Sequence, residues 1–152
     1  MKPSAFEYLA PESCDEAVEA LAEYGGDAAV LAGGQSLIPM MNLRIAAPPV
    51  IVDIMRITEL RTIDRDESRV EIGAGIRMAR AERESGVPLI ERALKHVGHS
   101  AIRNAGTVCG SIAHADPAAE LPAVLLALDG EVVLRSARGR RVVAADGFFR
   151  EP

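Results

Sequence analysis

The sequence predicts an α+β fold with two lobes, and three observations predict it. A helical pattern followed by two short apolar runs around a glycine pair is typical of a small βαβ-like unit. Two later pairs of alternating segments flank polar turns, which indicates a mostly antiparallel lobe, and helical stretches separate these pairs. We expect the first lobe to span residues 1–55 and the second, incomplete lobe to span residues 56–152.

The first lobe is expected to begin with a helix over residues 14–24. Ser13 stands three residues before Glu16, which fits a capping box, and apolar side chains then recur at helical spacing. After Pro48-Pro49 breaks the chain, the apolar run over residues 50–53 predicts a strand that closes this lobe.

Between these elements lies a glycine-centred segment. The apolar run over residues 28–31 predicts a buried strand that ends at Gly33-Gly34, and Ser36 is expected to cap a short helix over residues 37–43. A strand, a glycine turn and a helix start in this order predict an anion site, because main-chain amides at a helix N-terminus point outward together.

The second lobe is expected to combine hairpins with helices. Residues 60–63 and 70–72 flank a polar turn and predict the first hairpin. Helix propensity, early prolines and alternation predict the other elements, which are helices over residues 78–85, 88–97 and 121–128 and a second hairpin of residues 131–134 with 141–144. The segment from Thr107 to Ser111 is expected to be a loop.

Composition excludes several classes of function. The 152 residues carry a net charge of -5 and a pI near 5.2, which disfavours binding to nucleic acid or an anionic membrane. Neither a signal peptide nor a membrane span is recognisable, so we expect a cytoplasmic protein without membrane insertion. Two cysteines, Cys14 and Cys109, are too few to hold an iron-sulfur cluster, which we therefore expect in a partner chain.

Two segments have the chemistry of a pyrophosphate site. Each combines glycine, which lets main-chain amides approach a phosphate closely, with a Ser or Thr hydroxyl, and the segments are residues 32–36 (Ala-Gly-Gly-Gln-Ser) and residues 107–111 (Thr-Val-Cys-Gly-Ser). The dinucleotide fingerprint of a Rossmann fold and the Walker A sequence are both absent. The pattern predicts a dinucleotide held by another fold.

These two segments, the run His114-Ala115-Asp116-Pro117 and the stretch over residues 120–129 resemble the FAD-binding medium subunit of the molybdenum hydroxylases, the family of carbon monoxide dehydrogenase and xanthine dehydrogenase. The resemblance implies a two-lobed FAD-binding domain of the p-cresol methylhydroxylase and vanillyl-alcohol oxidase type, truncated before the C-terminal domain of its relatives. It implies an oxidoreductase subunit that passes electrons from [2Fe-2S] clusters in a small subunit to an external acceptor, while a large subunit holds molybdopterin. The chain would not act alone on the organic substrate.

The resemblance also assigns residues to the cofactor. It places the FAD pyrophosphate against Ala32, Gly33, Gly34, Gln35 and Ser36 on one side and Thr107, Val108, Cys109, Gly110 and Ser111 on the other. Asp116 would accept hydrogen bonds from ribityl or ribose hydroxyls, and its local alternative is a helix N-cap before Pro117. No side chain is assigned as a catalytic acid or base, and no residue is assigned to a metal.

The sequence departs from its relatives at several positions. Cys109 and Ser111 replace a glycine and an asparagine, and Ala105 replaces an arginine. If the backbone at Cys109 needed a positive φ, its side chain would cost about 1 kcal/mol. The alternative function is therefore a truncated remnant that keeps the fold and the partner interface but binds FAD weakly or not at all.

Two other interpretations remain open at this point. A zinc site is conceivable because three histidines and a cysteine gather within a short stretch, namely His96, His99, Cys109 and His114. Cys109 alone could equally be a buried, inert thiol. Arg103 could contact a phosphate or a partner, or it could be a structural arginine.

Overall fold

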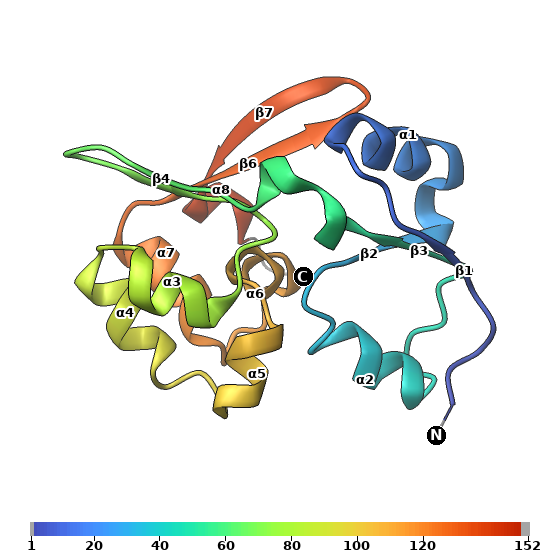
Figure 1. Ribbon diagram of the computed structural model, residues 1–152, viewed down its shortest axis with the longest axis horizontal. Coiled ribbons are helices and arrows are strands. Elements are labelled where there is room, and N and C mark those ends of the chain that lie inside the picture. Colours follow the sequence, from blue (N-terminus) through green and yellow to red (C-terminus); the bar gives the residue numbers. More distant parts are fainter. Residues whose placement is uncertain (1, 150–152) are drawn as a thin grey trace.

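The computed structural model describes residues 2–149, which divide into a half with a parallel sheet and a half rich in helices (Figure 1). The sheet contains β1 (Glu7–Leu9), β3 (Val50–Asp53) and β2 (Ala28–Leu31) in this spatial order, and all neighbours are parallel. Helix α1 (Cys14–Tyr24) packs on the sheet, and α2 (Leu37–Asn42) connects β2 to β3. Because β2 and β3 are parallel neighbours, both end at the same edge of the sheet.

The local signals of the first half predicted these elements well. Helix α1, β2 and β3 have the predicted bounds, and Ser13 Oγ accepts a hydrogen bond from the Glu16 amide at 3.2 Å. The Glu16 carboxylate returns to the Glu12 amide at 2.9 Å, one residue before the position that a standard capping box uses. Strand β1 was not predicted, because three residues carry too little alternation to be recognised.

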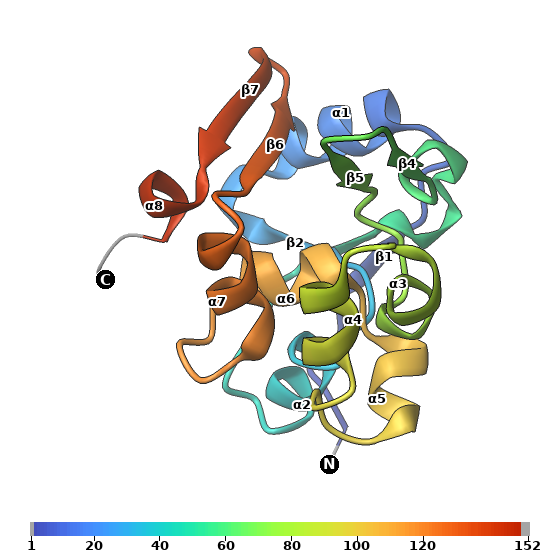
Figure 2. The same cartoon turned by 90° about the vertical axis from the view of Figure 1, so that its left-hand side faces the viewer.

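The second half has two separate antiparallel hairpins within the described residues. Strand β4 (Ile63–Arg65) pairs with β5 (Val70–Ile72), and β6 (Glu131–Ser136) pairs with β7 (Gly139–Ala144). The hairpin β4–β5 projects from the body in Figure 1, and β6–β7 extends toward α1 in Figure 2. An ion pair of 2.6 Å between Arg135 and Asp15 connects β6 to α1 there.

Six helices complete the second half of the described chain. They are α3 (Met78–Glu84), α4 (Pro88–Leu94), α5 (Ser100–Ala105), α6 (Val108–His114), α7 (Glu120–Ala127) and the short α8 (Ala145–Phe148). Three single 3-10 turns lie at Gly25–Asp27, Ile54–Arg56 and Thr58–Leu60. The last turn includes Leu60, the first residue of the strand predicted over residues 60–63, and the observed strand begins only at Ile63.

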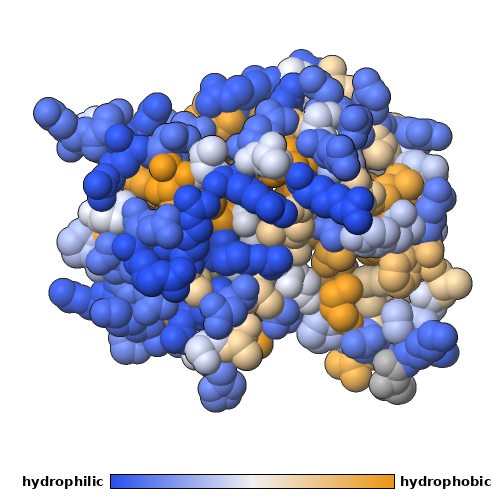
Figure 3. All heavy atoms as spheres, viewed as in Figure 1, coloured by the Kyte–Doolittle hydropathy of each residue, from blue (hydrophilic) through white to orange (hydrophobic). Residues whose placement is uncertain are grey.

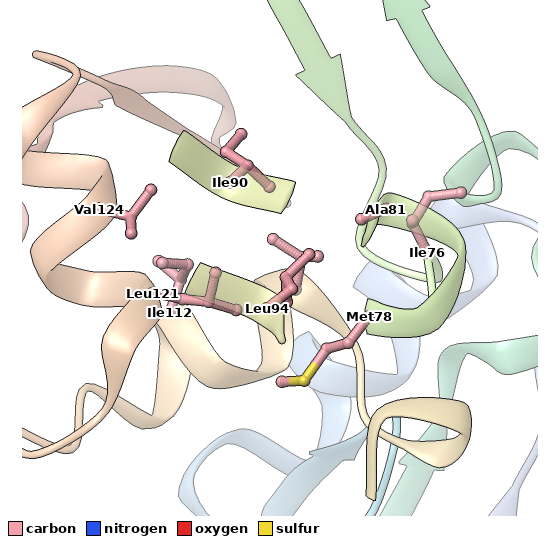
Figure 4. Packing of buried hydrophobic residues seen from close by; sticks show 9 residues of the cluster. Ile76, Met78, Ala81, Ile90, Leu94, Ile112, Leu121 and Val124 are labelled. Carbon is pink, nitrogen blue, oxygen red and sulfur yellow. The ribbon is translucent and has the colours of Figure 1, made fainter. Parts of the chain in front are cut away.

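Two separate apolar clusters form the core of the molecule. The first lies between α1 and the sheet and includes Ala17, Val50 and Val52. The second fills the space among α3, α4, α6 and α7, where Leu94 is fully buried and Ile90, Ile112 and Val124 surround it (Figure 4). At about 25 cal/mol per Å² of buried apolar surface, these aliphatic clusters give the main favourable term in folding.

The prediction of a loop over residues 107–111 is wrong. Residues 108–114 form α6, and α5 precedes it, so the glycine-rich stretch lies within two short helices joined at Gly106. Small residues and a Thr lower helix propensity, which hid both helices in the sequence. Packing of Val108 and Ile112 into the second cluster overrides that weak propensity.

Candidate functional site

The first candidate segment connects β2 to α2. Gly34 has φ +71, a left-handed conformation that favours glycine, and the chain turns there into the helix. No acceptor within residues 2–149 is recorded for the amides of residues 33–36, while the Gln35 side chain donates to the Gly33 carbonyl at 3.1 Å. Four consecutive amides at a turn are the donor set that binds a phosphate oxygen.

Ser36 occupies the N-cap position of α2 but does not cap it. Its side chain makes no capping hydrogen bond, and its backbone is helical with φ -104 and ψ -52. The predicted role as a cap is therefore wrong, because a capping hydroxyl needs an extended backbone to reach the amides beyond it. The Ser36 hydroxyl is left beside the four amides of its segment.

The second candidate segment forms the first turn of α6. Thr107 is its N-cap, and the buried Thr107 Oγ1 accepts from the Gly110 amide at 3.0 Å. The Val108 amide donates to the Ile76 carbonyl at 3.1 Å, and the Ser111 amide donates to the Thr107 carbonyl at 3.2 Å. Three of the amides predicted to donate to phosphate in this segment therefore already have protein acceptors, and the Thr107 hydroxyl oxygen is one of these acceptors.

The two segments lie directly against each other. A Cβ atom added to Gly33 would stand 2.5 Å from Gly106 Cα and 2.6 Å from the Ala105 carbonyl oxygen, and one added to Gly110 would stand 3.9 Å from Ala32 Cβ. Glycine at position 33 is therefore required by contact between the segments. The sequence prediction that these segments share one boundary, despite about seventy intervening residues, agrees with this geometry.

The surface is hollowed near this boundary. In the space-filling view, an indentation separates the side that carries α5 from the side that carries α2, and apolar residues gather on the α2 side (Figure 3). Leu43 and Ile45, just after α2, are 57% and 73% exposed. Separate hollows of about 330 and 190 Å³ lie on the two hairpins, and no predicted site residue lines either of them. In this view the indentation at the boundary is open to the surface.

Asp116 lies just beyond α6 on an exposed turn. Its Oδ1 accepts from the Ala118 amide at 2.9 Å, and the preceding Ala115 is left-handed with φ 52. The N-cap of α7 is Ala119, so the local alternative for Asp116, a helix cap before Pro117, is wrong. The aspartate instead closes a turn through its own side chain, and its exposure leaves the carboxylate accessible to a hydroxyl.

Cys109 is a helical residue with an ordinary backbone. It is not among the described residues with a positive φ, so the conditional cost of about 1 kcal/mol does not arise. Its thiol donates to the Ile72 carbonyl at 3.4 Å, and burial raises its pKa to about 11. The side chain thus faces β5 as an unreactive thiol, as one of the two sequence interpretations held.

The histidines give no support to the zinc interpretation. Within residues 2–149, no group of three or more His, Cys, Asp or Glu side chains is placed to hold a metal ion. Arg103 is a structural arginine, because it forms an ion pair of 3.2 Å with Glu82 and donates to the Val97 and Gly98 carbonyls at 3.0 Å each.

A charged group that sequence reasoning missed lies beside the first segment. Asp53 ends β3 next to Leu31, the last residue before the glycine segment, and accepts from the Tyr8 hydroxyl at 2.5 Å and the Met55 amide at 2.8 Å. The hydrogen bond from the Tyr8 hydroxyl to Asp53 is the largest cause of the raised pKa of Tyr8. Arg77 donates to the Ala105 carbonyl from the other half. The place of Asp53 beside Leu31 depends on the pairing of β2 with β3, which the sequence alone does not give.

Comparison with known proteins identifies the family. Residues 4–152 match the family described as FAD binding domain in molybdopterin dehydrogenase. The chain belongs to this family. The carbon monoxide dehydrogenase medium chain of Hydrogenophaga pseudoflava is 44% identical over 153 residues, covering 98% of this chain and 53% of that one. The caffeine dehydrogenase subunit beta of Pseudomonas sp. is 41% identical over 154 residues, covering 98% and 52%.

Solved structures agree with this assignment. Carbon monoxide dehydrogenase from Hydrogenophaga pseudoflava superimposes with a TM-score of 0.95 at 45% identity, covering 99% of this chain and 54% of that chain. Quinoline 2-oxidoreductase from Pseudomonas putida superimposes with a TM-score of 0.93 at 35% identity, covering 100% and 56%. The chain spans about half the length of the relatives that it matches.

The family confirms the expected fold class, a two-lobed FAD-binding domain, and with it the resemblance to the medium subunits of molybdenum hydroxylases. The family model describes a domain type that binds FAD, and the similar chains are named as parts of dehydrogenases. The residues fit that cofactor unevenly. The four amides at residues 33–36 suit a diphosphate, whereas the 107–111 segment offers fewer donors than predicted. No helix of the described chain combines the length and apolarity that crossing a membrane requires.

Proposed function

We propose that this chain binds FAD at the boundary between residues 32–36 and 107–111 and serves as the flavin-bearing component of a molybdenum hydroxylase. The observation that carries the proposal is the contact of Gly33 with Ala105 and Gly106, next to four amides that have no recorded acceptor within residues 2–149. We also propose that the two lobes divide near residue 55, where the sheet half ends.

In this proposal the chain binds and orients, and bound FAD supplies the redox chemistry. The amides of residues 33–36 hold the diphosphate, with Ser36 as an additional hydroxyl donor. The Thr107 cap fixes the first turn of α6, so that Ala32 and Gly110 keep their spacing. Asp116, on its exposed turn, accepts from sugar hydroxyls of the cofactor. No residue of the chain acts as an acid or a base.

The partners follow from the relatives. The relatives carry names such as carbon monoxide dehydrogenase medium chain and caffeine dehydrogenase subunit beta, which denote components of larger enzymes. We propose an iron-sulfur small subunit that delivers electrons to the flavin, a molybdopterin large subunit, and an external acceptor that takes the electrons. Relatives named for different substrates share this domain, which supports placing substrate selection in another subunit.

A flavin titration tests the proposal. The purified protein should bind FAD with a change in flavin absorbance and fluorescence, and Gly34→Val should bind much more weakly, because a β-branched residue at φ +71 is strained. The matched control is Gly26→Val, where a Cβ meets nothing within 4 Å. A folded protein that leaves the flavin spectrum unchanged at high FAD concentration would refute FAD binding.

The remnant alternative loses one of its arguments in the structure. Its case rested partly on strain at Cys109, and that residue lies in an unstrained helix with its side chain toward Ile72. The same titration separates the two functions, since a remnant would keep the fold without a measurable flavin complex.

A further inference from the structure

Arg77 connects the back of the second segment to its surroundings. It precedes α3, and on either side of it the Met78 amide donates to the Gly106 carbonyl at 2.9 Å, while the Ile76 carbonyl accepts from Val108 at 3.1 Å. The Arg77 guanidinium donates to the carbonyl of Ala105. Three hydrogen bonds therefore join residues 105–108 to residues 76–78, and only the bond from Arg77 involves a side chain.

The same Ala105 carbonyl faces the first segment. A Cβ atom on Gly33 would stand 2.6 Å from that oxygen, so Gly33 packs directly on the group that Arg77 holds. The Arg77 side chain is partly buried. Burial lowers the pKa of its guanidinium, the Arg61 charge adds to this effect, and the Asp53 carboxylate at the sheet edge opposes it. The guanidinium thus lies among groups from both halves.

We propose that Arg77 is a positioning residue for the FAD site, which acts through the Ala105 carbonyl to set how closely residues 105–107 approach the glycine segment. This inference rests on the proposed FAD binding. A planar guanidinium can hold one carbonyl while its other donors stay solvated, which a shorter or apolar side chain cannot reproduce. Arg77 does not touch the diphosphate in this proposal, and its effect is transmitted through the contact of Ala105 and Gly106 with Gly33.

Three variants test the proposal. Arg77→Met keeps the aliphatic stem and removes the donors, and Arg77→Lys keeps a charge and a donor. Arg83→Met is the control, at an exposed position in α3, the helix that Arg77 precedes. For each purified protein, the dissociation constant for FAD and the thermal midpoint without flavin are measured. We expect Arg77→Met to bind FAD roughly tenfold more weakly, with a flavin-free midpoint close to that of the wild type, since a hydrogen bond to one carbonyl is lost.

Rescue distinguishes positioning from a general structural role. Arg77→Lys should recover part of the FAD affinity, and Arg83→Met should match the wild type. Unchanged FAD affinity in Arg77→Met would overturn this inference without affecting the proposed function. The same holds if the loss of affinity accompanies a large fall in the flavin-free thermal midpoint and Arg77→Lys does not restore it. A wild-type protein that binds no FAD would instead refute the proposed function, and this inference with it.

Discussion

Replacing Gly33 with alanine should separate the two halves of the site. The new Cβ would stand 2.5 Å from Gly106 Cα and 2.6 Å from the Ala105 carbonyl oxygen, and both neighbours are main-chain atoms that cannot rotate away. Carbon atoms pack at about 3.5–4.0 Å, so the segments must move apart by about 1 Å. Overpacking of this kind costs about 1–3 kcal/mol, and main-chain neighbours favour the upper end.

The assay combines stability with flavin binding. For a domain of this size, a loss of about 3 kcal/mol lowers the thermal midpoint by roughly 6–12 °C. A shift of about 1 Å also lengthens hydrogen bonds beyond their useful range, so FAD affinity should fall roughly tenfold or more. Gly26→Ala is the matched control, because the same change there meets nothing within 4 Å. If Gly33→Ala melted and bound FAD like Gly26→Ala, the contact between the segments would not exist in solution.

Three further changes probe the second segment. Thr107→Val removes the acceptor of the Gly110 amide and should lower the free energy of unfolding by about 1–2 kcal/mol in urea denaturation, whereas Thr107→Ser should stay close to the wild type. Cys109→Gly should destabilise α6 by roughly 0.3–0.5 kcal/mol through helix propensity and should not tighten FAD binding, and tighter binding in the titration would show that the cysteine crowds the cofactor. Because burial raises the Cys109 pKa from 9.0 to about 11, its contribution to stability is complete below pH 9 and disappears as the pH rises through 11. Cys109→Ala should therefore show a shallower alkaline loss of unfolding free energy, and an identical pH profile would contradict the burial of the thiol.

Much of the first half could be predicted because its signals are local. The Ser13 and Glu16 capping pattern, the apolar runs and the glycine pair each act within a few residues, and α1, β2 and β3 have the predicted bounds. The family resemblance extended this to the pairing of two distant segments, which the contact between Gly33 and Gly106 supports.

The rest depended on tertiary contacts that no short window contains. Residues 108–114 are helical because Val108 and Ile112 pack into the core, although glycine and threonine weaken the local signal. The acceptor of the Val108 amide and the place of Arg77 follow from how residues 76–78 lie against residues 105–108. The Ile76 carbonyl takes the Val108 amide from a distant part of the chain, whereas the Gly110 and Ser111 amides donate to Thr107 because this stretch is helical.

The central claim is that the main-chain amides of residues 33–36 hold the FAD diphosphate. Amide ¹H–¹⁵N NMR spectra recorded during an FAD titration test it residue by residue. Hydrogen bonding to phosphate should produce large shifts at residues 33–36, with smaller shifts at Gly110 and Ser111, whose amides already donate within the protein. Saturating FAD binding that leaves the amides of residues 33–36 unshifted would contradict the claim.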